Sequence, residues 1–384
     1  MMYFEINEID IASLSKILTS SFPDIKYTVD ANRLNFESTD PCYASLIQQV
    51  IKILENSKKF ENTSFNYENL YGDPSERIFY DKDVHLELLE RGDINWIGNG
   101  LVTLSGDFLK VKRALEQYWL EYVLNELQAV EIENPALWSP EIAEQSKYLE
   151  DFPHEATFVF GAKKDAGSVN KVAELVSDKE FLSGKADNSV DFKALALLGF
   201  CQPSVCTSCY YLLGKRTPVK SALYTTYNRV FRNEGSQRLD RLLSFSVRDI
   251  IVVGDEEYVR KTREVFLQKA DAFIRELVIE AKIVRATDPF FATKSNKVFM
   301  QKTADLKHEI QAWIPYERKA IAIGSVNLHL DTFGKRFSMN LKNGAAFSAC
   351  FGIGFERLTY SLFAQNGPNL DDWSIDLVEK LRLS

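Results

Sequence analysis

The chain has 384 residues, of which 45% are hydrophobic and 12% aromatic, and its formal net charge is −8. This length allows a large core and favours two domains. No apolar run reaches membrane-spanning length, the first residues lack a secretory signal pattern, and five cysteines do not suggest a disulfide framework. We therefore expect a cytoplasmic globular protein with no membrane partner.

Residues 1–78 are predicted to form a small α+β domain, to which the sequence assigns no role. Residues 3–6, 25–29 and 33–36 alternate between apolar and polar side chains, as strands do, and a turn-like step separates the last two. Residues 11–19 and 43–54 have apolar side chains at helical spacing. The polar stretch 55–67 predicts a linker.

Residues 79–384 are predicted to form one larger domain. A helix is expected over 107–128, where apolar side chains recur at helical spacing, and the polar stretch 161–197 predicts an insertion lying over the functional site or on the side where a partner docks. Strands are expected at 227–233 and 242–253, with a loop at 234–241 between them. Asp255 then has the position of a helix N-cap.

Further strands are expected at 310–314, 322–330 and 345–351, and the last is followed by a helical pattern over 358–364. Hairpin connections between strands, with helices of varied length between them, are typical of an antiparallel sheet. The expected fold class is therefore α+β, an antiparallel sheet flanked by helices.

Two short motifs carry the functional prediction. The first is Arg232-Asn233-Glu234 at the end of a strand, and the second runs from Gly352 to Arg357 at a strand-to-helix junction. An arginine offers a planar set of donors to phosphate oxygens, and glycines let the backbone approach a nucleotide closely. In this order, the motifs resemble motifs 2 and 3 of class II aminoacyl-tRNA synthetases, which implies amino-acid activation by ATP. The alternative for Arg232 and Glu234 is an ordinary cross-strand ion pair.

A wider set of short matches resembles the amino acid:[carrier protein] ligases, class II homologues related to the atypical archaeal seryl-tRNA synthetases. The matches are Tyr148-Leu149, Phe152-Pro153, residues 239–242, 244–245 and 286–291, Leu306-Lys307 and Glu309. The resemblance implies a zinc ion, bound by Cys206, Asp249 and Cys350, that takes the amino group of the substrate.

Two features of this ligand set depart from the family. Asp249 stands where the family has a glutamate, although aspartate is also a zinc ligand. Cys209 follows Cys206 by three residues, so the sequence leaves open which of the two is the first ligand. The alternative for all these cysteines is a set of small buried hydrophobic residues.

The resemblance also implies roles in the reaction of ATP with a small amino acid to form aminoacyl-AMP. Arg232 would hold the α-phosphate and the substrate carboxylate, Glu234 would accept from the adenine amino group, and Arg241 with Arg357 would bind the β- and γ-phosphates. The adenine would lie between Phe245 and Arg357, Glu309 would bind magnesium, and Asn327 with His329 would line the amino-acid pocket. Asn134-Pro135 lies where the family has the proline-bearing motif 1 strand of its homodimer interface.

The family passes the aminoacyl group to the phosphopantetheine thiol of a carrier protein, and the negative net charge argues against tRNA as the partner. Docking candidates for an acidic carrier are Lys163-Lys164, the Lys215, Arg216 and Lys220 cluster, and Arg260-Lys261 with Arg263, each of which is otherwise a solvated charge run. Two alternatives stay open: a seryl-type aminoacyl-tRNA synthetase, and a catalytically inactive synthetase-like binding module.

Overall fold

The computed structural model describes residues 2–6, 14, 15, 18, 26–30, 33–37, 43–45, 47, 48, 50, 51, 79–183, 192–216, 218–288 and 305–383. The predicted linker at 55–67, Cys42 and Phe291 lie outside the described residues. Among the helices formed by the described residues, none is both long enough and apolar enough to cross a membrane.

The N-terminal part contains a three-stranded antiparallel sheet in the order β1 (Met2–Glu5), β3 (Arg33–Phe36), β2 (Tyr27–Asp30). The hairpin predicted between the second and third strands is confirmed by their pairing. Leu14, Leu18, Ile47 and Val50, which are all helical, pack on this sheet together with Phe152 from the larger domain. The N-terminal core is therefore completed by a residue from outside the first 78, and the division predicted after residue 78 stays a prediction, because residues 52–78 are not described.

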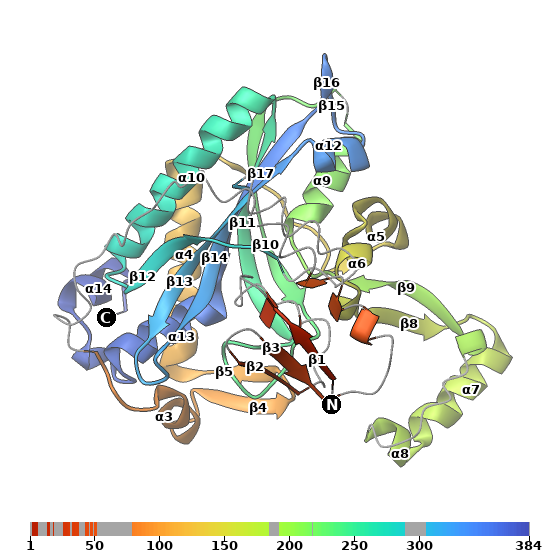
Figure 1. Cartoon of the computed structure of the whole chain (residues 1–384), viewed down its shortest axis with the longest axis horizontal. Helices are drawn as coiled ribbons and strands as arrows, with labels where there is room; N and C mark the ends of the chain where they lie inside the picture. Colours follow the sequence, from red (N-terminus) through yellow and green to blue (C-terminus); the bar gives the residue numbers. More distant parts are fainter. Residues whose placement is uncertain are drawn as a thin grey trace.

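A seven-stranded sheet forms the centre of the larger domain (Figure 1). Neighbouring strands are antiparallel, except that the last pair is parallel, so the predicted antiparallel α+β fold is confirmed. The strands, in order across the sheet, are β12 (Ala281–Arg285), β13 (Lys307–Ile314), β14 (Lys319–Leu330), β17 (Phe347–Gly354), β11 (Ser244–Gly254), β10 (Ala222–Phe231) and β6 (Val130–Glu131).

Three long helices, α4 (Gly106–Asn125), α10 (Glu256–Glu276) and α13 (Phe355–Asn366), pack against this sheet. Trp119 of α4 contacts Phe273 of α10 and Phe351 of β17 edge-on, with ring centroids 4.6 and 5.0 Å apart. The predicted cap of α10 is confirmed, because the Asp255 side chain accepts from the backbone N–H of Tyr258. The apolar side chains that predicted the helices are thus the ones that form the core.

Shorter elements surround this framework. They are α3 (Val84–Glu90), β4 (Ile94–Gly98), β5 (Leu101–Leu104), β7 (Leu137–Trp138), α5 (Pro140–Ser146), α6 (Tyr148–Asp151), β8 (Phe158–Ala162), α7 (Ala166–Ser177), α8 (Lys179–Leu182), β9 (Leu195–Cys201), α9 (Cys206–Gly214), α12 (Thr332–Arg336), β15 (Asn340–Leu341), β16 (Gly344–Ala345) and α14 (Ile375–Lys380), with 3-10 turns at Pro153–Glu155, Phe192–Ala194 and Leu370–Asp372.

Two predictions about this domain need correction. Pro135 lies between β6, the edge strand, and β7 rather than in a strand, and hydrogen bonds from the side chains of Asn134 and Asn228 hold this segment beside β10. The described part of the predicted insertion, from β8 through α8 to β9, projects away from the large sheet (Figure 1), so the predicted place over the functional site is wrong, while the partner-docking side stays a prediction. Strand β9 pairs with β8 and with β7, and these pairings form a sheet separate from the large one.

Candidate active site

The large sheet has two different faces because alternate side chains of a strand point in opposite directions. Ile250 and Phe351 lie in the core under the long helices, whereas Ile251 and Cys350 pack on the other face, beside α9. In the pairing register, Asp249 lies opposite Gly352, and Cys350 lies opposite Asn327. Residues distant in sequence therefore meet on the face away from the long helices.

The three residues predicted to bind zinc are brought together on this face. Cys206 is the first residue of α9, Asp249 lies in β11 and Cys350 in β17; all three are buried, and their ligand atoms lie within 4.8 Å of one another. Two thiolates and a carboxylate are a donor set that zinc binds, and a three-ligand site leaves a position for a substrate. The residues present therefore fit a catalytic zinc site.

Cys209 faces a different environment. It lies one helical turn after Cys206, is fully buried, and packs with Leu213 and Val253 in an apolar cluster. Burial raises the pKa of its thiol, but the pKa of the Cys206 thiol is raised as well, by its hydrogen bond with Cys350 and by burial, so thiol acidity does not separate the two cysteines. The position of the sulfur does, because Cys206 and not Cys209 lies with Asp249 and Cys350 in the cluster of candidate metal ligands. Between the two cysteines that the sequence could not separate, the geometry favours Cys206.

The electrostatics of the cluster also favour a bound cation. Burial raises the pKa of the Asp249 carboxyl, and the neighbouring Cys350 adds to this effect. The hydrogen bond with Cys206 lowers the pKa of Cys350. Anions held this far from water are costly unless a cation compensates them.

Gly352, in the second sequence motif, makes room for this carboxylate. A Cβ atom added at Gly352 would lie 2.2 Å from Oδ1 of Asp249, far inside contact distance. At Gly354, two residues along the same strand, the nearest atom to an added Cβ is the backbone oxygen of Ile323 at 3.7 Å, an ordinary contact. The position of the Asp249 carboxylate therefore requires a glycine at 352 but not at 354.

We predict that Gly352→Ala lowers the bound zinc well below one ion per chain, because the new methyl group displaces the Asp249 carboxylate. Gly354→Ala is the matched control, and it should keep its zinc. Elemental analysis of both purified chains measures the difference, with a thermal melt to confirm folding. Equal zinc in the two chains would show that Asp249 does not need the space at Gly352.

Arg232 follows β10 and lies at the centre of a group of charged residues. Its guanidinium carbon is 5.5 Å from the centroid of the Phe245 ring, and its Nε has no hydrogen-bond partner among the described residues. Burial by itself would lower the pKa of the guanidinium, but Glu155 and other acidic groups raise it above its ordinary value. A partly buried cation with a buried, unused donor atom is suited to binding an anionic group.

Glu234 and the other two arginines lie near Arg232. Nη1 of Arg241 is 3.1 Å from Oε2 of Glu234, so Glu234 pairs with the loop arginine. Arg357 lies in the first turn of α13, where its Nη1 donates to the carbonyl of Ala322 at 3.2 Å. Burial lowers the pKa of Arg357, whereas the charge of Glu234 acts to raise it. Arg232 and Glu234 of the first motif therefore lie close to Arg357 of the second motif.

The side chain of Glu356 connects the second motif to strand β11. Its buried carboxylate accepts from the backbone N–H of Ser246 at 2.7 Å and from the Ser246 hydroxyl at 2.9 Å. These bonds tie the start of α13 to β11, on which Asp249 also lies. The sequence alone indicated no role for Glu356, although this residue adjoins Arg357.

Asn327 and His329, predicted to line the amino-acid pocket, both lie against Cys350. The side-chain amide of Asn327 donates to Sγ of Cys350 at 3.5 Å, and Nε2 of His329 lies 3.7 Å from the same sulfur. Nδ1 of His329 is 3.2 Å from the hydroxyl of Ser348 and 3.3 Å from that of Tyr210. These contacts orient the predicted metal ligand, as outer residues of metal sites do.

Glu309 lies further along the same face. It is 8% exposed, accepts from Nε2 of Gln311 at 3.3 Å, and has Oε1 3.4 Å from Nζ of Lys307. Lys307 also forms an ion pair with Asp288. Burial would lower the pKa of Lys307, but Asp288 and Glu309 raise it, so this lysine is charged.

Lys307 and Glu155 are site residues to which the sequence alone assigned no role. Lys307 could have been found from strand alternation, because it lies two residues before Glu309 and therefore on the same face. Glu155 is 3% exposed, accepts from the hydroxyl of Tyr148 at 2.8 Å, and has a pKa raised by burial. It lies in a 3-10 turn, so no periodicity in the sequence marks it.

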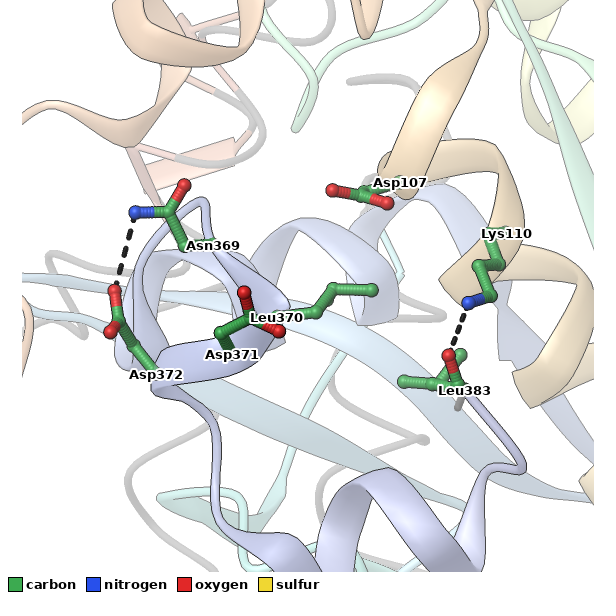
Figure 2. Close-up of a pocket in the computed structure, with 7 residues that line it drawn as sticks. All are labelled: Asp107, Lys110, Asn369, Leu370, Asp371, Asp372 and Leu383. Atoms are coloured by element: carbon green, nitrogen blue, oxygen red, sulfur yellow. Dashed lines mark hydrogen bonds between the residues drawn. The ribbon is translucent and has the colours of Figure 1, made fainter.

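A surface pocket lies apart from these residues. Figure 2 shows it between the start of α4 and the C-terminal segment, where Lys110 donates to the carbonyl of Leu383 and Asn369 donates to Asp372. Its lining is Asp107, Lys110, Asn369, Leu370, Asp371, Asp372 and Leu383. Because this lining includes no predicted site residue, the pocket does not bear on the chemistry proposed for the sheet face.

Comparisons with known proteins fit this geometry. No family model matches the chain. Over 243 residues the chain is 30% identical to amino acid–[acyl-carrier-protein] ligase 1 of Bradyrhizobium diazoefficiens, a match covering 62% of the chain and 72% of the relative. It is 25% identical over 313 residues to a type-2 serine–tRNA ligase of Methanococcus aeolicus, covering 79% of the chain but 60% of the relative.

Solved structures show the same fold. The seryl-tRNA synthetase of M. kandleri, crystallised with the tRNASec of A. aeolicus, matches with a TM-score of 0.68 and 19% identity, over 99% of this chain and 77% of that one. The seryl-tRNA synthetase of Pyrococcus horikoshii, crystallised with ATP, matches with a TM-score of 0.57 and 16% identity, over 87% and 68%. The chain therefore belongs to the amino acid–[acyl-carrier-protein] ligase family, is an enzyme of the ligase class, and has the fold of class II aminoacyl-tRNA synthetases.

Proposed function

We propose that this enzyme activates a small amino acid with ATP and transfers the aminoacyl group to the phosphopantetheine thiol of a carrier protein. The observation that carries the proposal is the meeting of two groups at one site. The Cys206, Asp249 and Cys350 cluster lies near Arg232, which directly follows strand β10 and whose charge acts on the buried Asp249 carboxyl. The cysteine and aspartate cluster suits a metal ion that binds the substrate amine. Arg232 suits the substrate carboxylate and a phosphate.

A zinc ion at the cluster would offer an open position to the α-amine of the substrate. Asn327 and His329 would hold Cys350 in place beside it. Arg232 would use its unpartnered Nε to orient the substrate carboxylate toward the α-phosphate. Such a transfer depends on positioning and charge stabilisation more than on acid or base groups.

The nucleotide would lie across the two motifs. The adenine would stack between Phe245 and Arg357, Glu234 would accept from its amino group, and Glu309 would bind magnesium. For this, Glu234 must leave Arg241, whose side chain is 51% exposed. An exposed ion pair contributes only about 0–1 kcal/mol of stability. Breaking the Glu234–Arg241 pair therefore requires little free energy, and it frees Arg241 for the β- and γ-phosphates.

The basic clusters considered for carrier docking differ in exposure. Arg263 is 5% exposed and its guanidinium bonds to Asp305 and His308, so it is structural and drops out of the docking prediction. Lys215 is exposed and pairs with Glu141 at 2.9 Å, while Lys163 and Lys164 lie exposed on the projecting segment after β8. The exposed members of the three clusters remain the docking candidates, namely Lys163, Lys164, Lys215, Arg216, Lys220, Arg260 and Lys261.

Transfer to tRNA is the second candidate function, because the type-2 serine–tRNA ligases match more of the chain than the carrier-protein ligases do. A net charge of −8 disfavours it, since phosphate contacts dominate affinity for nucleic acids. A homodimer and a cytoplasmic location remain predictions from the sequence.

The acceptor is tested in two steps. ATP–pyrophosphate exchange with each amino acid identifies the substrate, and the enzyme is then incubated with ATP, that amino acid, and either holo-carrier protein or total tRNA. We expect mass spectrometry to find the aminoacyl mass on the holo-carrier, whereas the apo-carrier, which lacks the thiol, stays unmodified. Efficient charging of tRNA with no transfer to a carrier would favour the synthetase function instead.

A further inference from the structure

The loop at 234–241, which carries Arg241, is folded back on itself. The backbone N–H of Arg241 donates to the carbonyl of Arg238 at 3.0 Å, and the backbone N–H of Ser236 donates to the carbonyl of Arg241 at 2.9 Å. The backbones of Arg238 and Arg241 are thus held together. A contact that fixes Arg238 therefore also fixes the arginine proposed to bind the β- and γ-phosphates.

The two ends of this loop contact the β4–β5 hairpin. The side-chain amide of Asn99, in the turn of that hairpin, donates to the carbonyl of Gly235 at 2.8 Å, and the backbone N–H of Leu243 donates to the carbonyl of Gly100 at 2.9 Å. A Cβ atom added at Gly100 would lie 2.5 Å from Cα of Gly235, so the two backbones are in direct contact. These contacts hold the ends of the loop, and its tip at Arg238 has different partners.

The tip of the loop is bound by the β13–β14 hairpin. Arg238 forms an ion pair with Glu317, which lies in the turn between the two strands. Nζ of Lys319, the first residue of β14, lies 2.7 Å from Oδ2 of Asp240 and 2.7 Å from Oε2 of Glu317. Burial by itself would raise the pKa of the Glu317 carboxyl, but the hydrogen bonds that it accepts lower that pKa to about 2, so the carboxylate is charged. Two ion pairs therefore join the loop to this hairpin.

The same hairpin also contacts the helix that carries Arg357. The hydroxyl of Tyr360, in α13, donates to Oε1 of Glu317 at 2.6 Å, and Nη1 of Arg357 donates to the carbonyl of Ala322, in β14, at 3.2 Å. The charge of Arg241 acts on Arg357, so the two arginines lie near each other. Glu317 is therefore shared between the loop of the first motif and the helix of the second.

We propose that Glu317 and Lys319 are positioning residues, which hold the loop at 234–241 on the β13–β14 hairpin and so place Arg241 near Arg357 before ATP binds. When only a fraction of the molecules has the loop in this place, the apparent affinity for ATP falls by that fraction. The consequence for ATP rests on the proposed function, whereas the order of the loop is a property of the free enzyme and is measured without a reaction.

The first measurement is limited cleavage of the full-length enzyme by trypsin, with no ATP present. Trypsin cleaves after the two arginines of the loop, and the residue that follows each of them is buried, Leu239 at 1% and Leu242 at 3% exposure. Cleavage there therefore follows the population of the open loop. We expect Glu317→Gln/Lys319→Met to be cut in the loop roughly tenfold faster than the unaltered enzyme, because two charged contacts are lost.

The double variant is designed to change the tether and keep the fold. Nε of Arg238 also lies 3.0 Å from Oδ1 of Asp240, so these two loop residues still pair with each other when the hairpin charges are removed. A glutamine at 317 keeps an oxygen that can accept from Tyr360. Mass spectrometry of the fragments identifies the bonds that are cut, and circular dichroism confirms folding.

The second measurement is ATP–pyrophosphate exchange at varied ATP and varied amino acid. In the double variant, KM for ATP should rise roughly tenfold, matching the fraction of molecules with the loop in place. KM for the amino acid should stay unchanged, because Arg232 and the cysteine and aspartate cluster are unaltered. A contact that only stabilises the fold would lower the amount of active enzyme, and hence kcat, with both KM values unchanged.

Glu121→Gln/Arg382→Met is the matched control. Nη1 and Nη2 of Arg382 each lie 3.1 Å from an oxygen of Glu121, so this ion pair also joins segments far apart in the chain, here α4 and the residues after α14. It includes no residue of the loop or of the β13–β14 hairpin. The control variant should therefore change neither the cleavage of the loop nor KM for ATP.

Unchanged cleavage in Glu317→Gln/Lys319→Met would overturn the inference, as would faster cleavage with an unchanged KM for ATP, or equal effects in the control. Glu317→Gln alone keeps the pair between Lys319 and Asp240, so it should show both changes to a smaller extent, and it decides the question if the double variant does not fold. If the unaltered enzyme exchanges pyrophosphate with no amino acid, the proposed function fails, and the cleavage rates still test whether the hairpin holds the loop.

Discussion

Arg232→Ala should reduce amino-acid-dependent ATP–pyrophosphate exchange by about two to three orders of magnitude. This corresponds to about 3–4 kcal/mol of lost transition-state stabilisation, the range expected when a preorganised donor to a developing charge is removed. The physical basis is the partly buried guanidinium beside Phe245, whose buried Nε has no hydrogen-bond partner among the described residues. Exchange rates at saturating ATP and amino acid measure the effect.

Two further variants make this result specific. Arg232→Lys keeps the positive charge but loses the planar pair of donors, so it should recover only part of the activity. Arg275→Ala removes an exposed arginine that pairs with Asp271 along α10, and it should leave exchange unchanged. Near-normal exchange in Arg232→Ala, with folding confirmed by circular dichroism, would mean that the first motif is structural.

Cys206→Ser and Cys350→Ser should each remove the zinc, which we expect at about one ion per chain, and should abolish exchange with it. A hydroxyl is a far weaker zinc ligand than a thiolate, and each change breaks a three-ligand site whose donor atoms lie within 4.8 Å of one another. Elemental analysis of the purified chains gives the metal content directly.

Cys209→Ser is the matched control, because Cys209 lies in the same helix but packs among apolar side chains. It should keep its zinc while losing about 1–3 kcal/mol of stability, the cost of burying a hydroxyl without a partner. Zinc retained in both Cys206→Ser and Cys350→Ser would disprove the metal assignment. Zinc lost only in Cys209→Ser would show that the first ligand is Cys209.

The inactive binding module considered from the sequence gains no support from the site. Arg232, Arg241 and Arg357 are all present, and their charges act on one another and on Glu234. Asp249, the main departure from the family, lies with both cysteines, in a space that Gly352 keeps open. The shorter carboxylate therefore does not prevent the cluster from forming.

Local patterns in the sequence determined most of the framework. The strands around the first motif, the helix capped by Asp255 and the strand before Arg357 were all predictable, because alternation, helical spacing and capping act within a few residues. The candidate zinc ligands were also predictable, but through resemblance to a family, since their spacing alone indicates no common site.

The tertiary structure decided matters that depend on register and on the face of an element. Cys206 and Cys209 differ by one helical turn and both pack in the same buried cluster, and only the docking of α9 on the sheet brings the first, and not the second, to Asp249 and Cys350. Asp288 reaches Lys307 because a backbone hydrogen bond holds its segment beside β13, and Glu155 lies near Arg232 although it belongs to an isolated turn. Such contacts join residues far apart in the chain, and their geometry is set by how strands pair and helices pack, which no local pattern encodes.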